Sequence, residues 1–157
     1  MGFFYNPNIH PYREYRKRLL TVRDFSARAG LDIEYRDEYD IDDYMHRIIG
    51  KGNLRCESCY RMRLDATGAA ARKNGATLMT TTLLYSKYQK HDVIIGIGKE
   101  MASEHGVGFY YEDFRKGWQK GIDESRRMGL YRQQYCGCLY SEQERYAKCP
   151  GFTDKGL

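Results

Sequence analysis

Apolar positions follow two different periods along the chain, and this pattern predicts helices that alternate with short strands. Between residues 12 and 29, apolar and aromatic side chains recur every three or four positions, which is typical of an amphipathic helix that ends at Gly30. Further helices are predicted where this pattern returns, over residues 40–49, 55–74, 91–105, 121–128 and 141–147. Asp40 is placed to cap the first of them.

The predicted strands are short runs of apolar, β-branched or aromatic residues, over positions 2–5, 31–35, 77–84 and 107–111. The run TLMTTTLL at 77–84 is the clearest of them. Strands that alternate with helices indicate βαβ units, in which ligands bind at the carboxyl ends of the strands. We therefore expect a single α/β domain over residues 1–157, with a mostly parallel, Rossmann-like sheet flanked by helices.

Composition narrows the class of protein. The 157 residues suit one domain, and 41% hydrophobic residues with a mean hydropathy of −0.75 predict a soluble globular protein. No apolar run approaches the roughly 18–20 residues of a membrane span. The opening MGFFYNPNIHP does not resemble a signal peptide. We expect a cytoplasmic protein that has no membrane partner.

The charge balance leaves a nucleic-acid partner open. The net charge is +5, and 26 lysines and arginines accompany 15 tyrosines. Arginine binds phosphate, and aromatic faces stack on unpaired bases. Surface arginine and tyrosine at the edge of a core explain the same composition, so composition alone does not decide.

Five cysteines carry the candidate chemistry. An odd number in a chain of cytosolic character argues against a disulfide framework and favours metal or redox work. Cys56 and Cys59 form a C-x-x-C motif at the start of a predicted helix, where both sulfurs can face one metal. The helix N-terminus and Arg55 favour the thiolate. The charged neighbours of this motif argue against deep burial.

Cys136 and Cys138 flank Gly137 in a C-x-C motif. Two thiols this close can ligate one centre, or they can form a strained disulfide that stores two electrons. Together with Cys56 and Cys59 they could build a Cys₄ zinc site or hold an iron–sulfur cluster, and the spacing leaves both open. Cys149 is expected to be a spectator.

Four segments carry a resemblance to a known family: FFYNPNIHP, RCESCYRMRL, TTTLLYSKYQ and LYRQQYCGCLYS. In this order and spacing they resemble the QueH family of epoxyqueuosine reductases over nearly the whole chain. The resemblance implies a cobalamin-independent enzyme with a [4Fe–4S] cluster. Such an enzyme removes the epoxide oxygen of epoxyqueuosine at the wobble position of tRNA anticodons.

The resemblance also implies roles for individual residues. Cys56 and Cys59 would be cluster ligands, and Cys136 and Cys138 would be the redox-active pair or the ligands of an additional iron. The partners would be a tRNA with a queuosine-type anticodon and an electron donor that the sequence does not identify. Residues near these motifs are candidates for substrate binding: Arg55, Arg61, Arg63, Tyr131, Arg132 and His10.

The chain departs from the family at its start. Family members place a strand and two adjacent cysteines before FFYNPNIHP, and those cysteines are expected to complete the cluster. The printed chain begins after them, so the first strand of the sheet is expected to be absent, and Met1 to be a false start in a longer gene. In-frame coding sequence for a strand and a Cys-Cys pair upstream of Met1 would support this expectation. A stop codon immediately before Met1 would contradict it.

A second function from another class is kept beside the first. The chain could be a non-catalytic RNA-binding module that holds a structural zinc ion on four cysteines. The colour of the protein separates the two, because iron–sulfur clusters absorb visible light and zinc does not.

Overall fold

The computed structural model describes residues 1–147. Its α-helices are α1 (Tyr12–Ala29), α2 (Ile41–Ile48), α3 (Arg55–Lys73), α4 (His91–Glu104), α5 (Trp118–Arg127) and α6 (Leu139–Tyr146). Its strands are β1 (Gly2–Phe4), β2 (Ile33–Tyr35), β3 (Leu78–Met79) and β4 (Gly108–Phe109). Three short 3₁₀ helices complete the described elements: η1 (Gly52–Leu54), η2 (Thr82–Tyr85) and η3 (Phe114–Gly117).

The strands pair in parallel, as the alternating pattern predicts, and the α/β class is confirmed. β1 pairs with β2, with Gly2 opposite Ile33, and β3 pairs with β4, with Leu78 opposite Gly108. Within residues 1–147 the strands form two separate two-stranded sheets, and the Rossmann-like arrangement of one continuous sheet is not confirmed. The strand expected upstream of Met1 stays a prediction.

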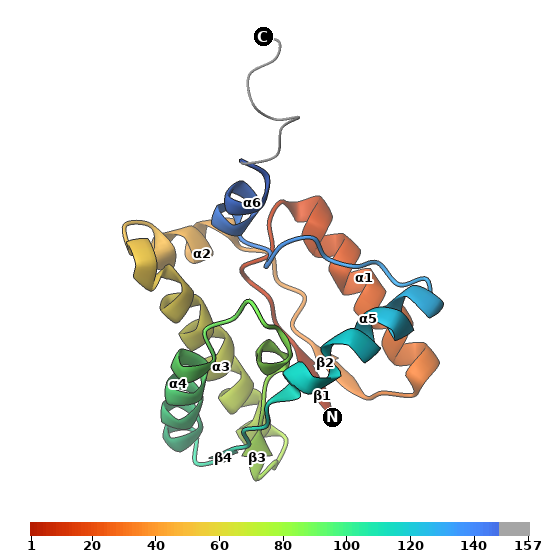
Figure 1. Ribbon diagram of the computed structural model, residues 1–157. Helices are drawn as coiled ribbons and strands as arrows, with labels where there is room; N and C mark the ends of the chain where they lie inside the picture. Colours follow the sequence, from red (N-terminus) through yellow and green to blue (C-terminus); the bar gives the residue numbers. More distant parts are fainter. Residues whose placement is uncertain (148–157) are drawn as a thin grey trace.

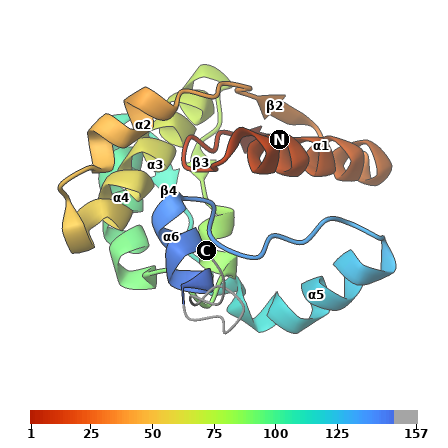
Figure 2. The same ribbon diagram turned by 90° about the horizontal axis from the view of Figure 1, so that it is seen from above.

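The helices fall into two groups around these strands. Helices α2, α3 and α4 lie on one side, and α1 and α5 lie on the other, in both views of the ribbon (Figures 1 and 2). The segment between α5 and α6 runs past α1 before it reaches α6 (Figure 1). This path brings residues 130–138 back to the beginning of the chain. No helix of the described part is long and apolar enough to cross a membrane.

Three clusters of buried side chains form the interior. The largest joins α3, α4 and the strands β3 and β4, and it includes Leu64, Leu84 and Ile94. A second packs Phe4 of β1 against α1. The third contains Tyr44 and Ile48 of α2 together with Cys59 of α3. One thiol of the C-x-x-C motif is therefore part of the interior.

Local signals predicted the helix ends well. Helix α1 ends at Gly30, whose φ of 62° lies in the left-handed region that favours glycine. Asp40 caps α2, because its side chain accepts the backbone N–H of Asp43 at 2.9 Å. Both features depend on residues close in sequence, which is why the sequence reveals them.

The strand predicted over residues 77–84 is wrong for most of its length. Only Leu78–Met79 is a strand, and Thr82–Tyr85 is the 3₁₀ helix η2. The hydroxyl of Thr81 accepts the backbone N–H of Leu83 at 3.2 Å and starts this turn. Leu83 and Leu84 are buried by the turn, so an apolar run with β-branched residues marks buried positions here without marking a strand.

Helix α4 packs closely on β4 through a glycine. A Cβ at Gly98 would lie 2.5 Å from two ring carbons of Phe109, whereas a Cβ at Gly96 on the same helix would meet no atom within 4 Å. Close packing therefore requires glycine at position 98 and not at position 96.

We expect Gly98→Ala to lower the free energy of unfolding by about 1–3 kcal/mol, because the Phe109 ring must move. Gly96→Ala is the matched control, and it should raise that free energy by up to about 1 kcal/mol through helix propensity. Urea denaturation of both variants measures the difference. Equal effects of the two substitutions would contradict the close packing.

Candidate redox and metal centre

The C-x-C loop is held against α1 by a buried arginine. Arg18 is only 7% exposed, and its guanidinium donates to the carbonyl oxygens of Cys136 at 2.9 Å and Tyr135 at 3.1 Å. It also donates to Gln133 Oε1 at 2.9 Å, and its Nε donates to Glu14 Oε1 at 2.7 Å. The guanidinium therefore fixes the backbone that carries the first thiol of the loop.

The NPNIHP loop covers the other side of the C-x-C motif. The backbone N–H of His10 donates to the carbonyl oxygen of Gly137 at 2.8 Å, and the hydroxyl of Tyr135 donates to the His10 carbonyl oxygen at 2.6 Å. Gly137 has a φ of 133°, and a Cβ there would lie 2.9 Å from Asn8 Nδ2. A side chain at Gly137 would therefore clash with this loop as well as strain the backbone.

The two cysteine motifs meet although they lie far apart in sequence. Cys59 is buried between α2 and α3 in the third interior cluster, and Cys138 packs against the same cluster. The amide Nε2 of Gln89 donates to the Sγ of Cys136 at 3.6 Å. Cys138 also caps α6, because its Sγ accepts the backbone N–H of Ser141 at 3.4 Å. The four thiols thus gather where α2, α3, α6 and the segment before α4 converge.

Burial controls the ionisation of the C-x-x-C thiols. It raises the pKa of Cys56 above its ordinary value, and it raises the pKa of Cys59 to about 12, against the smaller opposing effects of Arg55 on Cys56 and of Arg63 on Cys59. The expectation that these thiols avoid burial is therefore wrong for Cys59. Arg55 does favour the Cys56 thiolate, as expected, but the effect of burial on this pKa is larger. Neutral thiols at pH 7 would ionise when a metal cation binds.

The donor set suits soft metal chemistry. Thiolates are the ligands of iron–sulfur clusters and of structural zinc, and the two cysteine pairs supply them. Among residues 1–147, no three side chains of His, Cys, Asp or Glu lie close enough together to hold one metal ion as they stand. The chemistry of the donors therefore fits a cluster, although the thiols as they stand do not form a complete ligand set.

A hydrogen-bond chain orients the amide that faces Cys136. The hydroxyl of Tyr60, on α3, donates to Gln89 Oε1 at 2.7 Å, which leaves Gln89 Nε2 facing the sulfur. Tyr44 lies beside the other thiols, and its pKa is raised first by burial and then by Cys59 and Cys138.

The sequence did not reveal Arg18, Gln89, Tyr60 or Tyr44 as residues of this site. Arg18 alone had a visible signal, since it is a cation next to Leu19 on the apolar face of a helix.

Most of the predicted substrate-binding residues have protein partners. Arg55 forms an ion pair with Glu144, and Arg61 forms a bidentate pair with Glu100 at 2.7 and 2.8 Å. Arg63 donates to Asn6 Oδ1 at 2.8 Å, and the hydroxyl of Tyr131 donates to Glu14 at 2.7 Å. Arg132 is half-buried and forms no ion pair within the described residues. Their role in binding substrate stays a prediction.

His10 lies inside the protein. It is 0% exposed, its Nδ1 lies 3.0 Å from the hydroxyl of Tyr39, and its Nε2 has no hydrogen-bond partner among residues 1–147. Burial lowers its pKa, so the ring is neutral at pH 7. The sequence made His10 a candidate for substrate binding, and the structure places its backbone directly against the C-x-C loop. Cys149 lies outside the described residues.

Comparisons with known proteins point to one family. The family model described as "Epoxyqueuosine reductase QueH" matches residues 1–144. A protein of that name from Dehalococcoides mccartyi is 38% identical over 146 residues, which cover 93% of this chain and 80% of the relative. Another from Thermotoga maritima is 38% identical over 156 residues, with 93% and 81% covered. A third, from Helicobacter pylori, is 32% identical over 153 residues, with 90% and 41% covered.

Replacement of Arg18 should loosen the C-x-C loop. We expect Arg18→Met to lower the free energy of unfolding by about 3–5 kcal/mol, since it leaves Glu14 buried without its cation. Cys136 and Cys138 should also react faster with a thiol reagent.

Arg28→Met is the matched control for this change. Arg28 pairs with Asp24 four residues earlier on the same helix, but both side chains are about half exposed. Its loss should cost at most about 1 kcal/mol and should not change thiol reactivity. Unchanged thiol reactivity in Arg18→Met would contradict the role of Arg18 in the loop.

Proposed function

The chain belongs to the QueH family of epoxyqueuosine reductases, and on this premise we propose that its four gathered cysteines are the centre at which it reduces epoxyqueuosine in tRNA. The protein is an oxidoreductase, and its product is queuosine. One observation carries the proposal: the C-x-x-C motif on α3 and the C-x-C loop lie far apart in sequence, yet Cys59 of the one and Cys138 of the other share one interior cluster.

Cys56 and Cys59 are the proposed ligands of a [4Fe–4S] cluster. Their thiols are the donors such a cluster requires, and Cys59 is shielded from water by Tyr44 and Ile48. A bound cluster would supply electrons one at a time. Cys136 and Cys138 are the proposed electron-storing pair, with ligation of an additional iron as the alternative role.

The thiol pair balances the reaction. Reduction of the epoxide to an alkene consumes two electrons and two protons and releases water. Oxidation of the Cys136 and Cys138 thiols to a disulfide supplies two electrons and two protons, because one S–S bond forms and two S–H bonds break. A separate electron donor must then reduce the disulfide. Arg18 holds the Cys136 backbone in place in the dithiol form.

The departing oxygen needs a proton from an acid close to it. His10 is neutral, buried and joined to the C-x-C loop through its backbone, which suits a role in positioning the loop.

The proposal also includes a cytoplasmic location, a tRNA partner with a queuosine-type anticodon and a separate electron donor. The zinc-binding module is not favoured, because the chain's relatives are named as reductases.

Removal of one proposed ligand should remove the cluster. With the upstream Cys-Cys segment that is expected to complete the cluster, anaerobically purified protein should be brown, with broad absorption in the ~400 nm region typical of thiolate-bound iron–sulfur clusters. Cys56→Ser should lose this absorption and turnover of epoxyqueuosine tRNA, whereas Cys149→Ser should keep both. Colourless parent protein with stoichiometric zinc would overturn the proposal and restore the zinc-binding module.

Gln89 should set the redox potential of the thiol pair. Its N–H donates to the Cys136 sulfur of the dithiol form, and an ordinary hydrogen bond is worth about 0.5–1.5 kcal/mol. Gln89→Leu should therefore make the thiol–disulfide potential more negative by roughly 10–30 mV, at ~30 mV per 1.4 kcal/mol.

Titration against dithiothreitol buffers measures this potential. Gln119→Leu is the control, because Gln119 donates only to Asp123 on α5 and should leave the potential unchanged. A potential for Gln89→Leu equal to that of the control would show that the amide does not act on the sulfur.

A further inference from the structure

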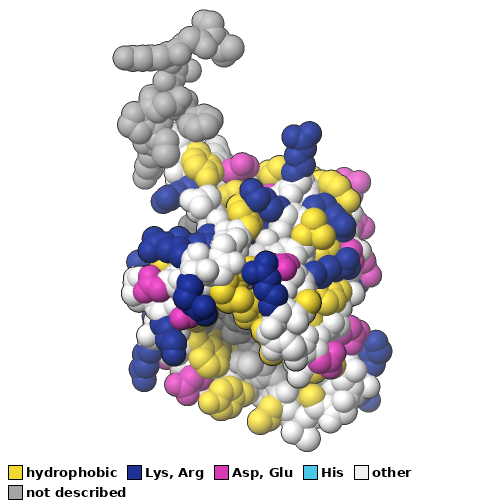
Figure 3. Space-filling view, turned by 90° about the vertical axis from the view of Figure 1, so that its right-hand side faces the viewer, with side chains coloured by type: hydrophobic (Ala, Val, Ile, Leu, Met, Phe, Trp, Pro, Cys, Tyr) yellow, Lys and Arg dark blue, Asp and Glu magenta, His cyan; other side chains and the backbone are white. Residues whose placement is uncertain are grey.

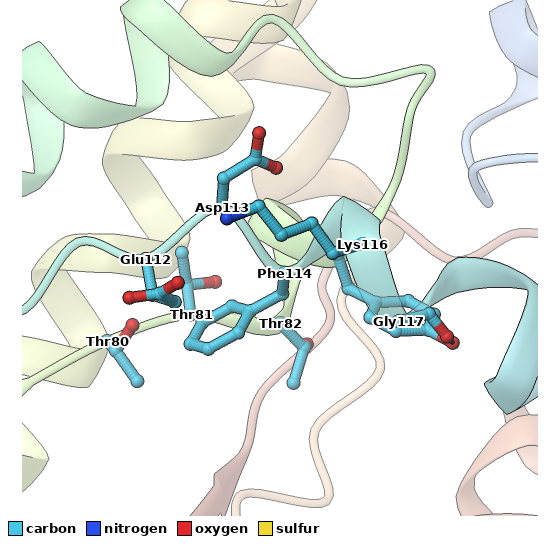
Figure 4. Close-up of a pocket in the computed structure, with 9 residues that line it drawn as sticks. Thr80, Thr81, Thr82, Glu112, Asp113, Phe114, Lys116 and Gly117 are labelled. Atoms are coloured by element: carbon cyan, nitrogen blue, oxygen red, sulfur yellow. Dashed lines mark hydrogen bonds between the residues drawn. The ribbon is translucent and has the colours of Figure 1, made fainter.

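A cavity of about 620 Å³ opens at the carboxyl ends of β3 and β4, and none of the four gathered cysteines lines it. Its walls are residues 80–82 and Tyr85, which follow β3, and residues 112–114, 116 and 117, which follow β4. Figure 4 shows the Phe114 ring beside Thr81 and Thr82, with the carboxylate of Glu112 near Thr80 and Thr81. Its volume is that of a small-molecule site, for which about 300–1,000 Å³ is usual.

An aromatic and cationic cluster borders this cavity. The ring of Trp118 lies 5.5 Å from that of Tyr85 and 6.0 Å from that of Tyr88, between centroids. Lys87 Nζ lies 5.2 Å from the centre of the Tyr88 ring and 5.9 Å from that of Trp118. We call Tyr85, Lys87, Tyr88 and Trp118 the rim cluster. Tyr88 is 76% exposed, so its ring is open to a partner.

The rim cluster is held in place before any ligand binds. The hydroxyl of Tyr85 donates to the carbonyl oxygens of Gly117 at 2.8 Å and Trp118 at 3.2 Å. A Cβ at Gly121 would lie 1.8 Å from the Tyr85 hydroxyl, so only glycine leaves room for this ring. Tyr85 thereby forms a wall of the cavity and also fixes Trp118 at its edge.

The charges around the cavity are open to a ligand. Lys87 and Lys116 form no ion pair in the part of the chain that the structure describes, and neither does Glu112, whose Oε2 accepts the hydroxyl of Tyr110 at 3.5 Å. Asp113 is paired with Arg115 at 2.7 Å, so it is already neutralised. The face that carries α1 and α5 shows hydrophobic side chains around a hollow, with lysines and arginines spread between them (Figure 3).

We propose that the cavity receives the splayed 7-deazaguanine ring of epoxyqueuosine, and that the rim cluster stacks on a neighbouring base of the anticodon loop. The proposal rests on the proposed function, which supplies the base. Enzymes that act on a base take it out of its stack into a pocket with aromatic walls, as Tyr85 and Phe114 provide. Exposed aromatic rings with lysines beside them bind single-stranded RNA.

Glu112 reads the edge of the base. A guanine-type ring presents two adjacent N–H donors on its pairing edge, and a carboxylate can accept both. Adenine presents an acceptor at one of these positions, which a carboxylate repels. Glu112 therefore favours a guanine-type ring over an adenine, while Lys87 and Lys116 contact the phosphates on either side.

Trp118 is the only tryptophan of the chain, so its fluorescence reports on this surface. The probe is an anticodon stem–loop RNA with guanosine at the wobble position, titrated into the anaerobically purified protein. We expect its binding to quench Trp118 fluorescence. Tyr88→Ala should raise the Kd by about 5- to 150-fold, the range measured for loss of one stacked base. Lys87→Ala should raise the Kd and reduce its dependence on salt.

Matched controls are available on other elements. Tyr12 is 53% exposed on α1, and Lys99 is exposed on α4. Tyr12→Ala and Lys99→Ala should leave the Kd within twofold of the parent value. A stem–loop with adenosine at the wobble position should bind more weakly to the parent, and Glu112→Ala should remove that preference.

Kd values within twofold of the parent for both Tyr88→Ala and Lys87→Ala would overturn the proposal, whether or not the fluorescence responds. An unchanged preference for guanosine in Glu112→Ala would overturn the assignment of the base to the cavity. Turnover of epoxyqueuosine tRNA by the parent is measured separately. A parent that turns over while these variants bind normally leaves the reductase function standing and this surface rejected.

Discussion

The site depends on one buried cation. A guanidinium removed from water is tolerated only when its donors are satisfied, and Arg18 meets this condition with Glu14, Gln133 and two backbone carbonyls of the C-x-C loop. Loss of any one of these partners would leave a buried charge or a buried donor unpaired. The positions of the partners are therefore tightly constrained. The loop that carries Cys136 is therefore part of the α1 unit, although it lies about 118 residues later in the chain.

The C-x-x-C thiols belong to the other group of helices. Cys59 is buried on α3 against α2, and Cys56 packs against the large cluster of α3 and α4. The centre thus forms where the α1 side and the α2–α4 side of the molecule meet. A site between two such units brings together pairs of thiols that neither unit holds alone, and Cys138 links the two units by packing against the α2–α3 cluster.

The sequence predicts those parts of the structure that local interactions determine. Gly30 ends α1 and Asp40 caps α2, both through neighbours in sequence, and Gly98 acts through the space that a missing side chain leaves. The helices that contain or adjoin these residues were predicted. The turn after β3 was missed because Thr81 starts a 3₁₀ helix within a β-branched pattern that predicts a longer strand. Pairing over long range was also invisible. Arg61 resembles a free cation in the sequence and is paired with Glu100, 39 residues away.

The segment from Tyr85 to Gln89 links the two chemistries of the molecule. Tyr85 is a wall of the cavity, and Gln89 donates to the sulfur of Cys136. Four residue steps span at most about 14 Å at ~3.3–3.6 Å per residue, and a turn shortens the span here, because the N–H of Gln89 donates to the carbonyl oxygen of Ser86. A wall of the cavity and the amide that contacts Cys136 therefore lie on one short segment. If the cavity receives the base, recognition of the base and delivery of electrons both depend on this segment.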